Sequence, residues 1–323
     1  MKRTPPVQPL PSQGGNTENP VAKVGTPPLS PQNSTKQINH VGLAEKFRSY
    51  RKHPLSLVLI LLILAAAFVT FFILFYLIGY ILVKGVPYIK PSLFELNYTT
   101  ENVSMFPAIV TTIAMTALSL LIAAPLAIFT AIYLVEYAKR GNKVVEVIRL
   151  TTETLSGIPS IVYGLFGLLF FVTTLEWGFS LLAGACTISI MILPTIMRTT
   201  EEALKSVPDA FREASFGLGA GRLRTVFRAV FPSAAPGIMA GIILAVGRIV
   251  GETAALMYTS GTVAQIPNGL FSSGRTLALH MYALSSEGLY TDQAYATAVI
   301  LLVTVFLINT LSACIANRLT REK

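Results

Sequence analysis

The sequence of 323 residues is 53% hydrophobic and only 13% charged, whereas soluble domains carry roughly 25% charged residues. This composition excludes an ordinary water-soluble protein, because so few charged side chains cannot cover a solvated surface. The net charge of +9 would suit a nucleic-acid-binding protein, but the positions of the charges give it another explanation. The two cysteines, Cys186 and Cys314, lie in apolar runs without the spacing of a metal site or a disulfide framework.

Residues 1–54 differ in composition from the rest of the chain. Prolines alternate there with Ser, Gln, Asn, Thr and Gly, and such a segment buries too little apolar surface to fold, which predicts a disordered tail. It is not a secretory signal peptide, because the first long apolar stretch begins only after Pro54 and is too long. The basic end of the tail is expected to contact anionic lipid head groups through Lys46, Arg48, Arg51 and Lys52.

Six apolar stretches are long enough to cross about 30 Å of hydrocarbon as helices. They predict an all-α membrane protein with six transmembrane helices in a permease domain at 55–317, with spans at about 55–83, 106–135, 150–173, 178–198, 233–258 and 295–317. The third and fourth are the weakest, because Pro159 and Pro194 interrupt them. A merged or re-entrant pair is the alternative there.

The basic residues orient these spans. If the N-terminal tail is cytoplasmic, 21 of the 25 Lys and Arg residues lie on the cytoplasmic side. Only Lys84, Lys90 and Arg275 then lie outside, and Arg248 lies within a span. This is a strong positive-inside pattern, and it accounts for the basic charge without nucleic acid. Both ends of the chain are therefore predicted to be cytoplasmic.

The cytoplasmic loop at 199–232 has more pattern than a linker needs. Pro208 and Asp209 predict a helix start, three spaced glycines up to Gly221 predict a break, and a second helix is expected from about Leu223. An amphipathic helix lying on the membrane would explain the arginines of the second half. It would not explain a short acidic-capped helix that ends in glycines. We therefore expect the first helix to project and to contact a partner.

Two charges fall inside the fifth predicted span. Arg248 and Glu252 are four residues apart and would share one face of a continuous helix. Each costs roughly 2.5–3.5 kcal/mol at mid-bilayer, so neither should face lipid. A self-neutralising pair that only fixes helix packing is one interpretation. The other is a polar lining of a translocation path, in which Arg248 attracts an oxyanion and Glu252 accepts hydrogen bonds from a protonated phosphate.

The spacing of the cytoplasmic loop resembles the EAA loop of bacterial ABC-importer permeases. The family pattern is Glu-Ala-Ala, three residues, Gly, nine residues, Ile, one residue and Leu-Pro, and this chain departs from it mildly at Ser215, Ala229 and Phe231. The resemblance implies a type I (MetI-like) permease fold and a coupling helix that seats in a groove of an ATPase subunit. It assigns that contact to Glu213, Ala214, Ser215, Gly219 and Pro232.

Residues 55–320 further resemble the PstA family of phosphate-transport permeases. Three segments carry the likeness, at 155–167, 251–255 and 276–282. The resemblance implies passage of phosphate along Arg248 and Glu252. It also implies assembly with a PstC-like second permease, two PstB-like ATPase subunits that bind ATP and Mg²⁺, and an external PstS-like phosphate-binding protein in a bacterial inner membrane.

The sequence contains no Gly-x-x-x-x-Gly-Lys-Ser/Thr phosphate loop, so the chain is not expected to be an enzyme or to bind a cofactor itself. Another cargo, such as molybdate, sulfate or an amino acid, remains an alternative, as does an autonomous channel or carrier or a membrane-anchored scaffold. A lone histidine in the last external loop, His280, has no ligand spacing and is expected to lie at the surface.

Overall fold

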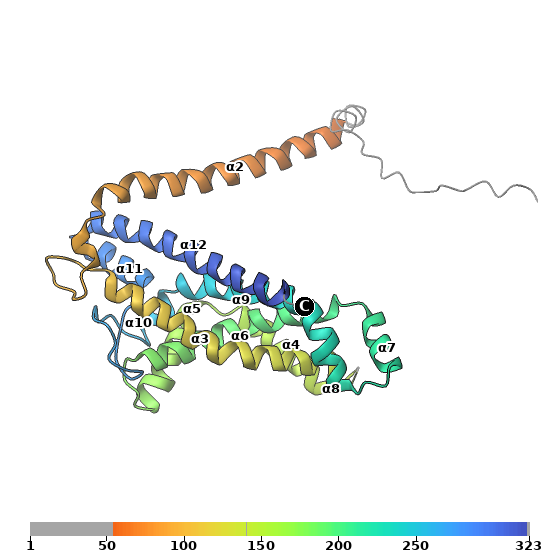
Figure 1. Ribbon diagram of the computed structural model, residues 1–323. Helices are drawn as coiled ribbons and strands as arrows, with labels where there is room; N and C mark the ends of the chain where they lie inside the picture. Colours follow the sequence, from red (N-terminus) through yellow and green to blue (C-terminus); the bar gives the residue numbers. More distant parts are fainter. Residues whose placement is uncertain (1–53, 140, 322–323) are drawn as a thin grey trace, which may run out of the picture. The chain divides into compact units, whose positions relative to one another are not determined.

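A computed structural model describes residues 54–139 and 141–321, and in these residues all regular structure is helical (Figure 1). The predicted tail, apart from Pro54, lies outside the described residues. The longer helices are α2 (Pro54–Gly85), α3 (Phe106–Ile132), α4 (Lys143–Ser156), α5 (Ser160–Gly167), α6 (Leu181–Lys205), α7 (Asp209–Gly217), α9 (Phe231–Val250), α11 (Leu277–Glu287) and α12 (Thr291–Arg321). Shorter turns are the 3₁₀ segments Val86–Tyr88 and Pro91–Phe94, the π segments Tyr133–Tyr137, Leu168–Thr174 and Val226–Val230, and α8 (Arg222–Thr225) and α10 (Ala254–Met257).

Two compact units make up the chain, Met1–Phe68 and Val69–Lys323. The described part of the first unit belongs to α2, whose side chains are apolar and exposed, as expected of a helix that faces lipid. The core and the sites below all lie in the second unit. Among the described residues, five helices are long and apolar enough to cross a membrane, and α4 with α5 makes a sixth if the two form one bent span.

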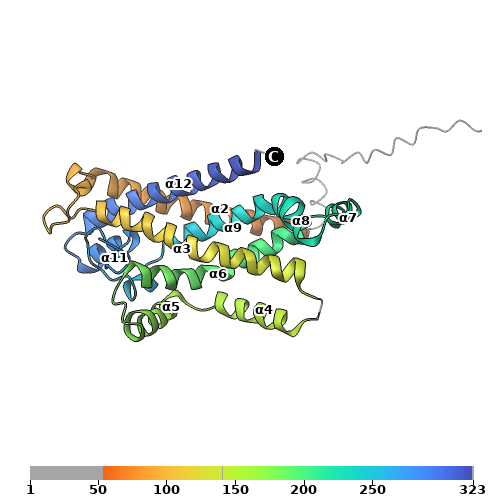
Figure 2. The same cartoon turned by 60° about the horizontal axis from the view of Figure 1, so that its bottom comes forward.

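The third predicted span, at 150–173, is not one straight helix. α4 ends at Ser156, α5 starts at Ser160, and the two meet at an angle of 104° (Figure 2). Pro159 causes the break, because its backbone is extended (φ −62°, ψ 144°) and it lacks the N–H that a continuous helix requires. The expectation of a single third helix is therefore corrected to a broken one.

The fifth predicted span, at 233–258, is also shorter than expected. α9 ends at Val250, residues 251–253 are not helical, and the short helix α10 follows. Gly251 lies at the end of α9 in a right-handed conformation (φ −85°, ψ −5°), which does not require glycine. The end of α9 changes the geometry of the charged pair described below.

The core of the second unit lies between α3, α6 and α9. Most of the residues along α6 are buried, among them Ile188, Ile192 and Ile196, and alanines of α3 pack against them. Several polar side chains in this core are satisfied locally, for Thr112 and Thr187 donate hydrogen bonds to carbonyl oxygens one turn earlier, at 2.7 and 2.8 Å. Such bonds let hydroxyls lie in an apolar interior. The hydroxyls of Ser119 and Thr200 are buried without a partner among the described residues.

Two glycines bring α9 close to α6. A Cβ atom at Gly241 would lie 2.0 Å from Thr199 Oγ1, and one at Gly237 would lie 2.6 Å from the Cβ of Ala203. The Gly-x-x-x-Gly pattern at 237–241 thus makes a close helix contact. The second pattern, at 247–251, does not, because a Cβ at Gly247 would meet nothing within 4 Å among the described residues.

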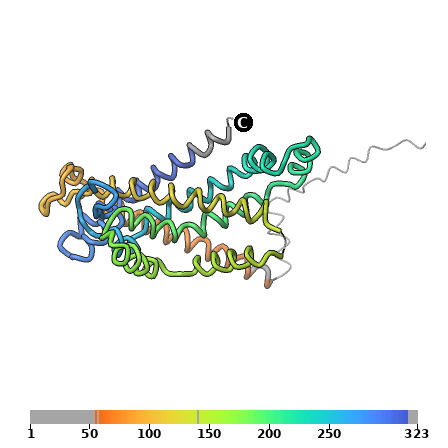
Figure 3. The backbone as a smooth tube through the Cα atoms, turned by 90° about the horizontal axis from the view of Figure 1, so that it is seen from below, coloured from red at the N-terminus to blue at the C-terminus, as the bar shows by residue number. Residues whose placement is uncertain are grey.

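The ends of the helices carry different structures. α7 and α8 lie at one end of α6, and α10 and α11 lie at the other, which can be followed in Figure 1 and as the blue and teal segments of Figure 3. The predicted coupling loop is therefore separated from the last predicted external loop by the length of the helices.

Candidate functional site

The loop at 199–232 contains the helix, glycine turn and second helix that its residues predict, but α6 extends into it to Lys205 and α8 continues into α9. α7 begins at Asp209 directly after Pro208 and ends at Gly217. Gly219 then adopts φ +80°, a left-handed conformation that costs little only for glycine. α8 begins at Arg222, and the hydroxyl of Ser215 lies 2.9 Å from that of Thr225, which ties the two helices together. The spaced glycines thus make the turn between two short helices.

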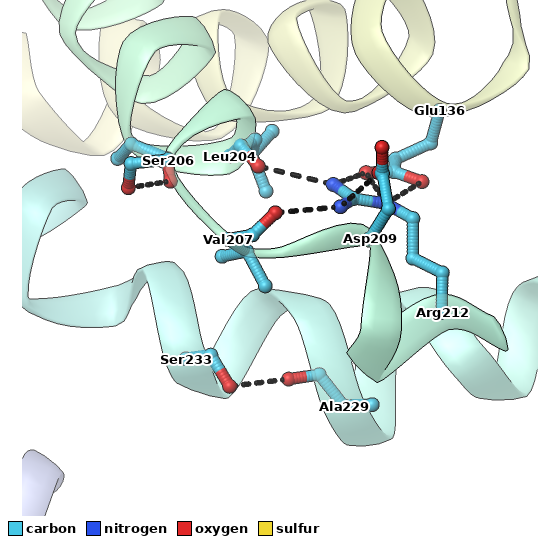
Figure 4. Close-up of polar contacts among 9 residues, drawn as sticks. Glu136, Leu204, Ser206, Val207, Asp209, Arg212, Ala229 and Ser233 are labelled. Carbon is cyan, nitrogen blue, oxygen red and sulfur yellow. Dashed lines mark hydrogen bonds and ion pairs between the residues drawn. The ribbon is translucent and has the colours of Figure 1, made fainter. Parts of the chain in front are cut away.

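Arg212 fixes α7 to the rest of the protein. Its guanidinium donates to the Glu136 carboxylate at 2.7 Å, to the carbonyl oxygens of Val207 and Leu204 at 2.8 and 3.0 Å, and to Asp209 at 3.2 Å (Figure 4). The side chains of Arg212 and Glu136 are only 16% and 8% exposed. The hydrogen bond to Glu136 raises the pKa of Arg212, so Arg212 keeps its positive charge.

The face of α7 that points away from this anchor is open. Glu213 and Ala214 are exposed, and so are the apolar side chains of Phe211, Phe216 and Leu218, the last at 89%. Glu213 makes no ion pair with the described residues. An exposed carboxylate among large apolar side chains on a rigidly held helix is typical of a protein-binding surface. We call Phe211, Glu213, Ala214, Phe216 and Leu218 the α7 surface.

The remaining residues assigned to the coupling loop lie close to α7 or follow it. Ser215 is half-buried against Thr225, Gly219 is exposed in the turn, and Pro232 lies in the first turn of α9. The structure thus brings Glu213, Ala214 and Gly219 to the surface, whereas Ser215 and Pro232 support the turn and the following helix.

Arg248 and Glu252 do not form the helical pair that their spacing predicts. Arg248 is exposed in the last turn of α9, whereas Glu252 lies beyond the end of that helix and is 9% exposed. The Glu252 carboxylate accepts a hydrogen bond from the backbone N–H of Ala255 at 3.1 Å and thereby caps α10. Glu252 therefore supports the break after α9, and no ion pair joins it to Arg248 in the described residues.

One cavity in the described residues, of about 490 Å³, is lined by acidic and basic residues alike, and two others differ in charge. The larger, of about 980 Å³, lies beside α7 and mixes acidic residues such as Glu146 and Asp209 with basic ones such as Lys139 and Arg149. The smaller, of about 590 Å³, contains one charged residue. It is lined by Thr195, Ile243, Leu244, Gly247, Arg248 and Asn309. The larger cavity is lined by five basic and four acidic residues, whereas Arg248 in the smaller cavity has no acidic residue beside it in the lining, an arrangement that attracts an anion.

His280 is buried rather than exposed, which corrects the surface position expected from the sequence. It is 0% exposed on α11 beside Arg275, which is 6% exposed. The Arg275 guanidinium lies 4.8 Å from the centre of the Tyr98 ring, a favourable cation–π distance. Burial, and then the charge of Arg275, lower the pKa of His280 to about 3. α11, which carries His280, lies at the opposite end of the helices from α7 (Figure 1).

Three residues at these sites were not predicted from the sequence. Arg212 and Glu136 are 76 residues apart, and no local pattern joins them. Asn309 lies in the apolar run of α12, and its only signal is an amide among aliphatic residues. Arg198, at the inner end of the fourth predicted span, makes an exposed contact of 3.6 Å with Glu202, which contributes little to stability.

Known relatives match most of the chain. It is 38% identical over 208 residues to the probable ABC transporter permease protein YqgI of Bacillus subtilis, which covers 59% of this chain and 70% of that protein. It is 33% identical over 222 residues to the phosphate transport system permease protein PstA 1 of Mycobacterium tuberculosis. This match covers 68% of this chain and 72% of that protein. The phosphate transport system permease protein PstC of Mesorhizobium japonicum is 33% identical, and the match covers 66% of this chain and 73% of that protein.

Solved structures show the same fold at lower identity. A permease chain of a bacterial alginate ABC transporter superposes with a TM-score of 0.63 at 16% identity, over 85% of this chain and 99% of that one. A chain of the MetNI methionine ABC transporter superposes with a TM-score of 0.54 at 19% identity, over 67% of this chain and 94% of that one. The family model for binding-protein-dependent transport system inner membrane components matches residues 123–322. The chain belongs to this family, and it is a multi-pass permease of the ABC-importer type.

Proposed function

We propose that this permease carries inorganic phosphate into a bacterial cell by alternating access, driven by ATP that partner subunits hydrolyse. The observation that carries the choice of cargo is Arg248, an exposed cation in a span that lines a cavity without an acidic residue. A guanidinium offers several N–H donors to a tetrahedral oxyanion. Relatives named as phosphate transport permeases support the same cargo.

Coupling to ATP hydrolysis is proposed to occur through the α7 surface. The exposed Glu213 and Ala214 would contact a groove of the ATPase subunit, and Gly219 would let α7 project from the loop. Because Arg212 ties α7 to Glu136 and to the end of α6, a push on α7 would pass to the spans as a rigid movement. ATP and Mg²⁺ would be bound by the ATPase, with no cofactor and no catalytic residue in this chain.

The proposed assembly contains a PstC-like second permease, two PstB-like ATPase subunits and an external PstS-like phosphate-binding protein. The segments at 155–167 and 251–255, which resemble the PstA family, support assigning this chain to the PstA position of the assembly. The positive-inside distribution supports cytoplasmic ends of the chain, with α7 on the cytoplasmic side and α11 on the external side. Lipids, and no nucleic acid, would be its other contacts.

Transport by the reconstituted complex tests the cargo. The permease pair, the ATPase and the phosphate-binding protein are placed in vesicles, and uptake of labelled phosphate, sulfate and molybdate is followed with and without ATP. We expect ATP-dependent uptake of phosphate only. Equal uptake without ATP would instead indicate a channel or carrier, and uptake of sulfate or molybdate in place of phosphate would refute the proposed cargo.

A further inference from the structure

A protonated phosphate bound beside Arg248 would need a hydrogen-bond acceptor other than Glu252. From its place in a protonated-phosphate path, the Glu252 carboxylate was expected to accept a hydrogen bond from the anion, but it caps α10 and does not line this cavity. A proton-bearing anion held by Arg248 would therefore need its acceptor from another lining residue. Of the remaining five, only Thr195 and Asn309 have polar side chains.

Asn309 has the unsatisfied atom. It lies on α12, its residue is partly buried, and its Oδ1 atom is buried without a hydrogen-bond partner among the described residues. Neighbouring side chains on α12, such as Phe306, Leu307 and Leu311, are apolar and exposed. A buried carbonyl oxygen without a partner is rare in folded proteins, and in a membrane span it costs more because no water replaces the missing donor.

The chemistry of phosphate matches this pair of groups. Near neutral pH inorganic phosphate keeps at least one proton, so it presents both oxygens that accept and an O–H that donates. Arg248 has only donors and can hold the charged oxygens, whereas the Asn309 carbonyl can only accept from the O–H. Sulfate carries no proton at this pH, so it would leave the Asn309 oxygen without a hydrogen-bond donor, although the amide N–H groups of Asn309 could still donate to it. A site built to accept a hydrogen bond from an O–H discriminates strongly against a ligand that lacks it.

We propose that Asn309 is a specificity-determining residue of the translocation path, which accepts a hydrogen bond from the protonated oxygen of a phosphate held by Arg248. The proposal rests on the proposed function, since it takes phosphate as the cargo. It names the group that recognises the protonated oxygen of the phosphate. Thr195, from α6, completes the polar side of the same cavity. Three helices, α6, α9 and α12, thus each contribute one polar side chain.

Uptake by the reconstituted complex separates this proposal from the proposed function. Asn309→Leu removes the acceptor at similar volume, and Asn309→Asp keeps an acceptor but adds a negative charge. We expect Asn309→Leu to lower kcat for phosphate at least tenfold with KM unchanged, because KM is set by the binding protein. We expect Asn309→Asp to transport best at a lower pH than the wild type, where more of the phosphate is the singly charged ion. Thr310→Val, at an exposed residue outside the cavity lining, is the matched control and should transport normally.

A binding measurement without the binding protein completes the test. Phosphate should raise the unfolding temperature of the solubilised wild-type complex more than sulfate does, and Asn309→Leu should abolish the difference. If Asn309→Leu transports phosphate at the wild-type kcat and Asn309→Asp has the wild-type pH profile, the assignment of Asn309 is wrong and the cavity holds only water or lipid. If the wild-type complex does not transport phosphate, the proposed function fails instead, whatever the Asn309 variants do.

Discussion

Arg212 is the residue on which the position of α7 depends. Its partner Glu136 is 8% exposed, so Glu136→Gln leaves a largely buried guanidinium without its main counter-charge. Breaking a buried pair from one side typically costs roughly 3–5 kcal/mol. We expect amide hydrogen exchange in Asp209–Gly217 to accelerate at least tenfold in Glu136→Gln, because local opening of α7 becomes easier.

Asp209 provides the control for this experiment. It also contacts Arg212, at 3.2 Å, but its side chain is 87% exposed, and exposed pairs contribute only about 0–1 kcal/mol. Asp209→Asn should therefore change exchange in α7 much less than Glu136→Gln does. Equal protection of α7 in wild type and Glu136→Gln would show that the anchor lies elsewhere.

His280 gives the protein a pH dependence with a defined sign. Its pKa is lowered from 6.5 to about 3, so below pH 6.5 the unfolded chain takes up a proton that the folded chain does not. The contribution of the neutral His280 to the free energy of unfolding is therefore fully present above pH 6.5 and is lost as the pH falls towards 3. Between pH 6.5 and pH 5 the loss amounts to about 2 kcal/mol.

The measurement compares thermal unfolding of wild type and His280→Gln in detergent at pH 7.5 and pH 5. The variant cannot take up this proton, so its unfolding temperature should fall less on acidification. A parallel fall in both proteins would rule out His280 as the titrating group, since the rest of the chain is the same.

At single residues, sequence reasoning identified the two charges within the fifth span, and their part in a substrate path stays a prediction. Arg248 was expected to be polar lining because a charge in an apolar run is costly, and it does line a cavity. Glu252 was placed wrongly, because its spacing assumed that the helix continues beyond Val250. The Arg212–Glu136 pair could not be found at all, since contacts across 76 residues depend on the packed fold.

Of the two glycines that bring α9 close to α6, Gly241 makes the tighter contact. At Gly241 a methyl group would lie 2.0 Å from Thr199 Oγ1 and 2.8 Å from Thr199 Cβ, well inside normal contact. We expect Gly241→Ala to lower the unfolding temperature of the solubilised protein, even though alanine favours a helix by about 1 kcal/mol over glycine. Thr199→Ala in the same chain removes the nearest atom and should recover part of the loss.

Gly247 lies on the same helix and serves as the control. A Cβ there meets nothing within 4 Å in the described residues, so Gly247→Ala should be neutral or slightly stabilising. If Gly241→Ala were as stable as Gly247→Ala, α6 and α9 would not be held at the distance that the structure shows.

At the level of helices, hydropathy predicted where long apolar helices occur but not where they break. The apolar runs coincide with α2, α3, α6, α9 and α12. The breaks at Pro159 and Gly251 are local events, and composition averaged over a span does not reveal them. The turn in the loop at 199–232 was predictable, because spaced glycines after a proline-capped helix determine the local backbone.

For the whole molecule, coupling through α7 predicts a separation of two activities. Glu213→Lys reverses an exposed charge on the α7 surface without touching the core. We expect it to reduce ATP-dependent phosphate uptake at least tenfold while ATP hydrolysis by the partner persists, because a charge reversal at a contact with a partner weakens docking. Glu287→Lys, an exposed reversal on α11 at the other end of the helices, is the matched control. Normal uptake in Glu213→Lys would refute the proposed contact.

The most direct test of the central proposal measures phosphate uptake and ATP hydrolysis together in vesicles that contain the assembled complex with Arg248→Gln. The substitution removes the one charge that lines the cavity in the described residues and leaves the α7 surface intact. We predict that uptake is lost while ATP hydrolysis continues, because the anion loses its binding group but the coupling contact remains. Phosphate uptake at the wild-type rate in Arg248→Gln would contradict the proposal that phosphate passes along this residue.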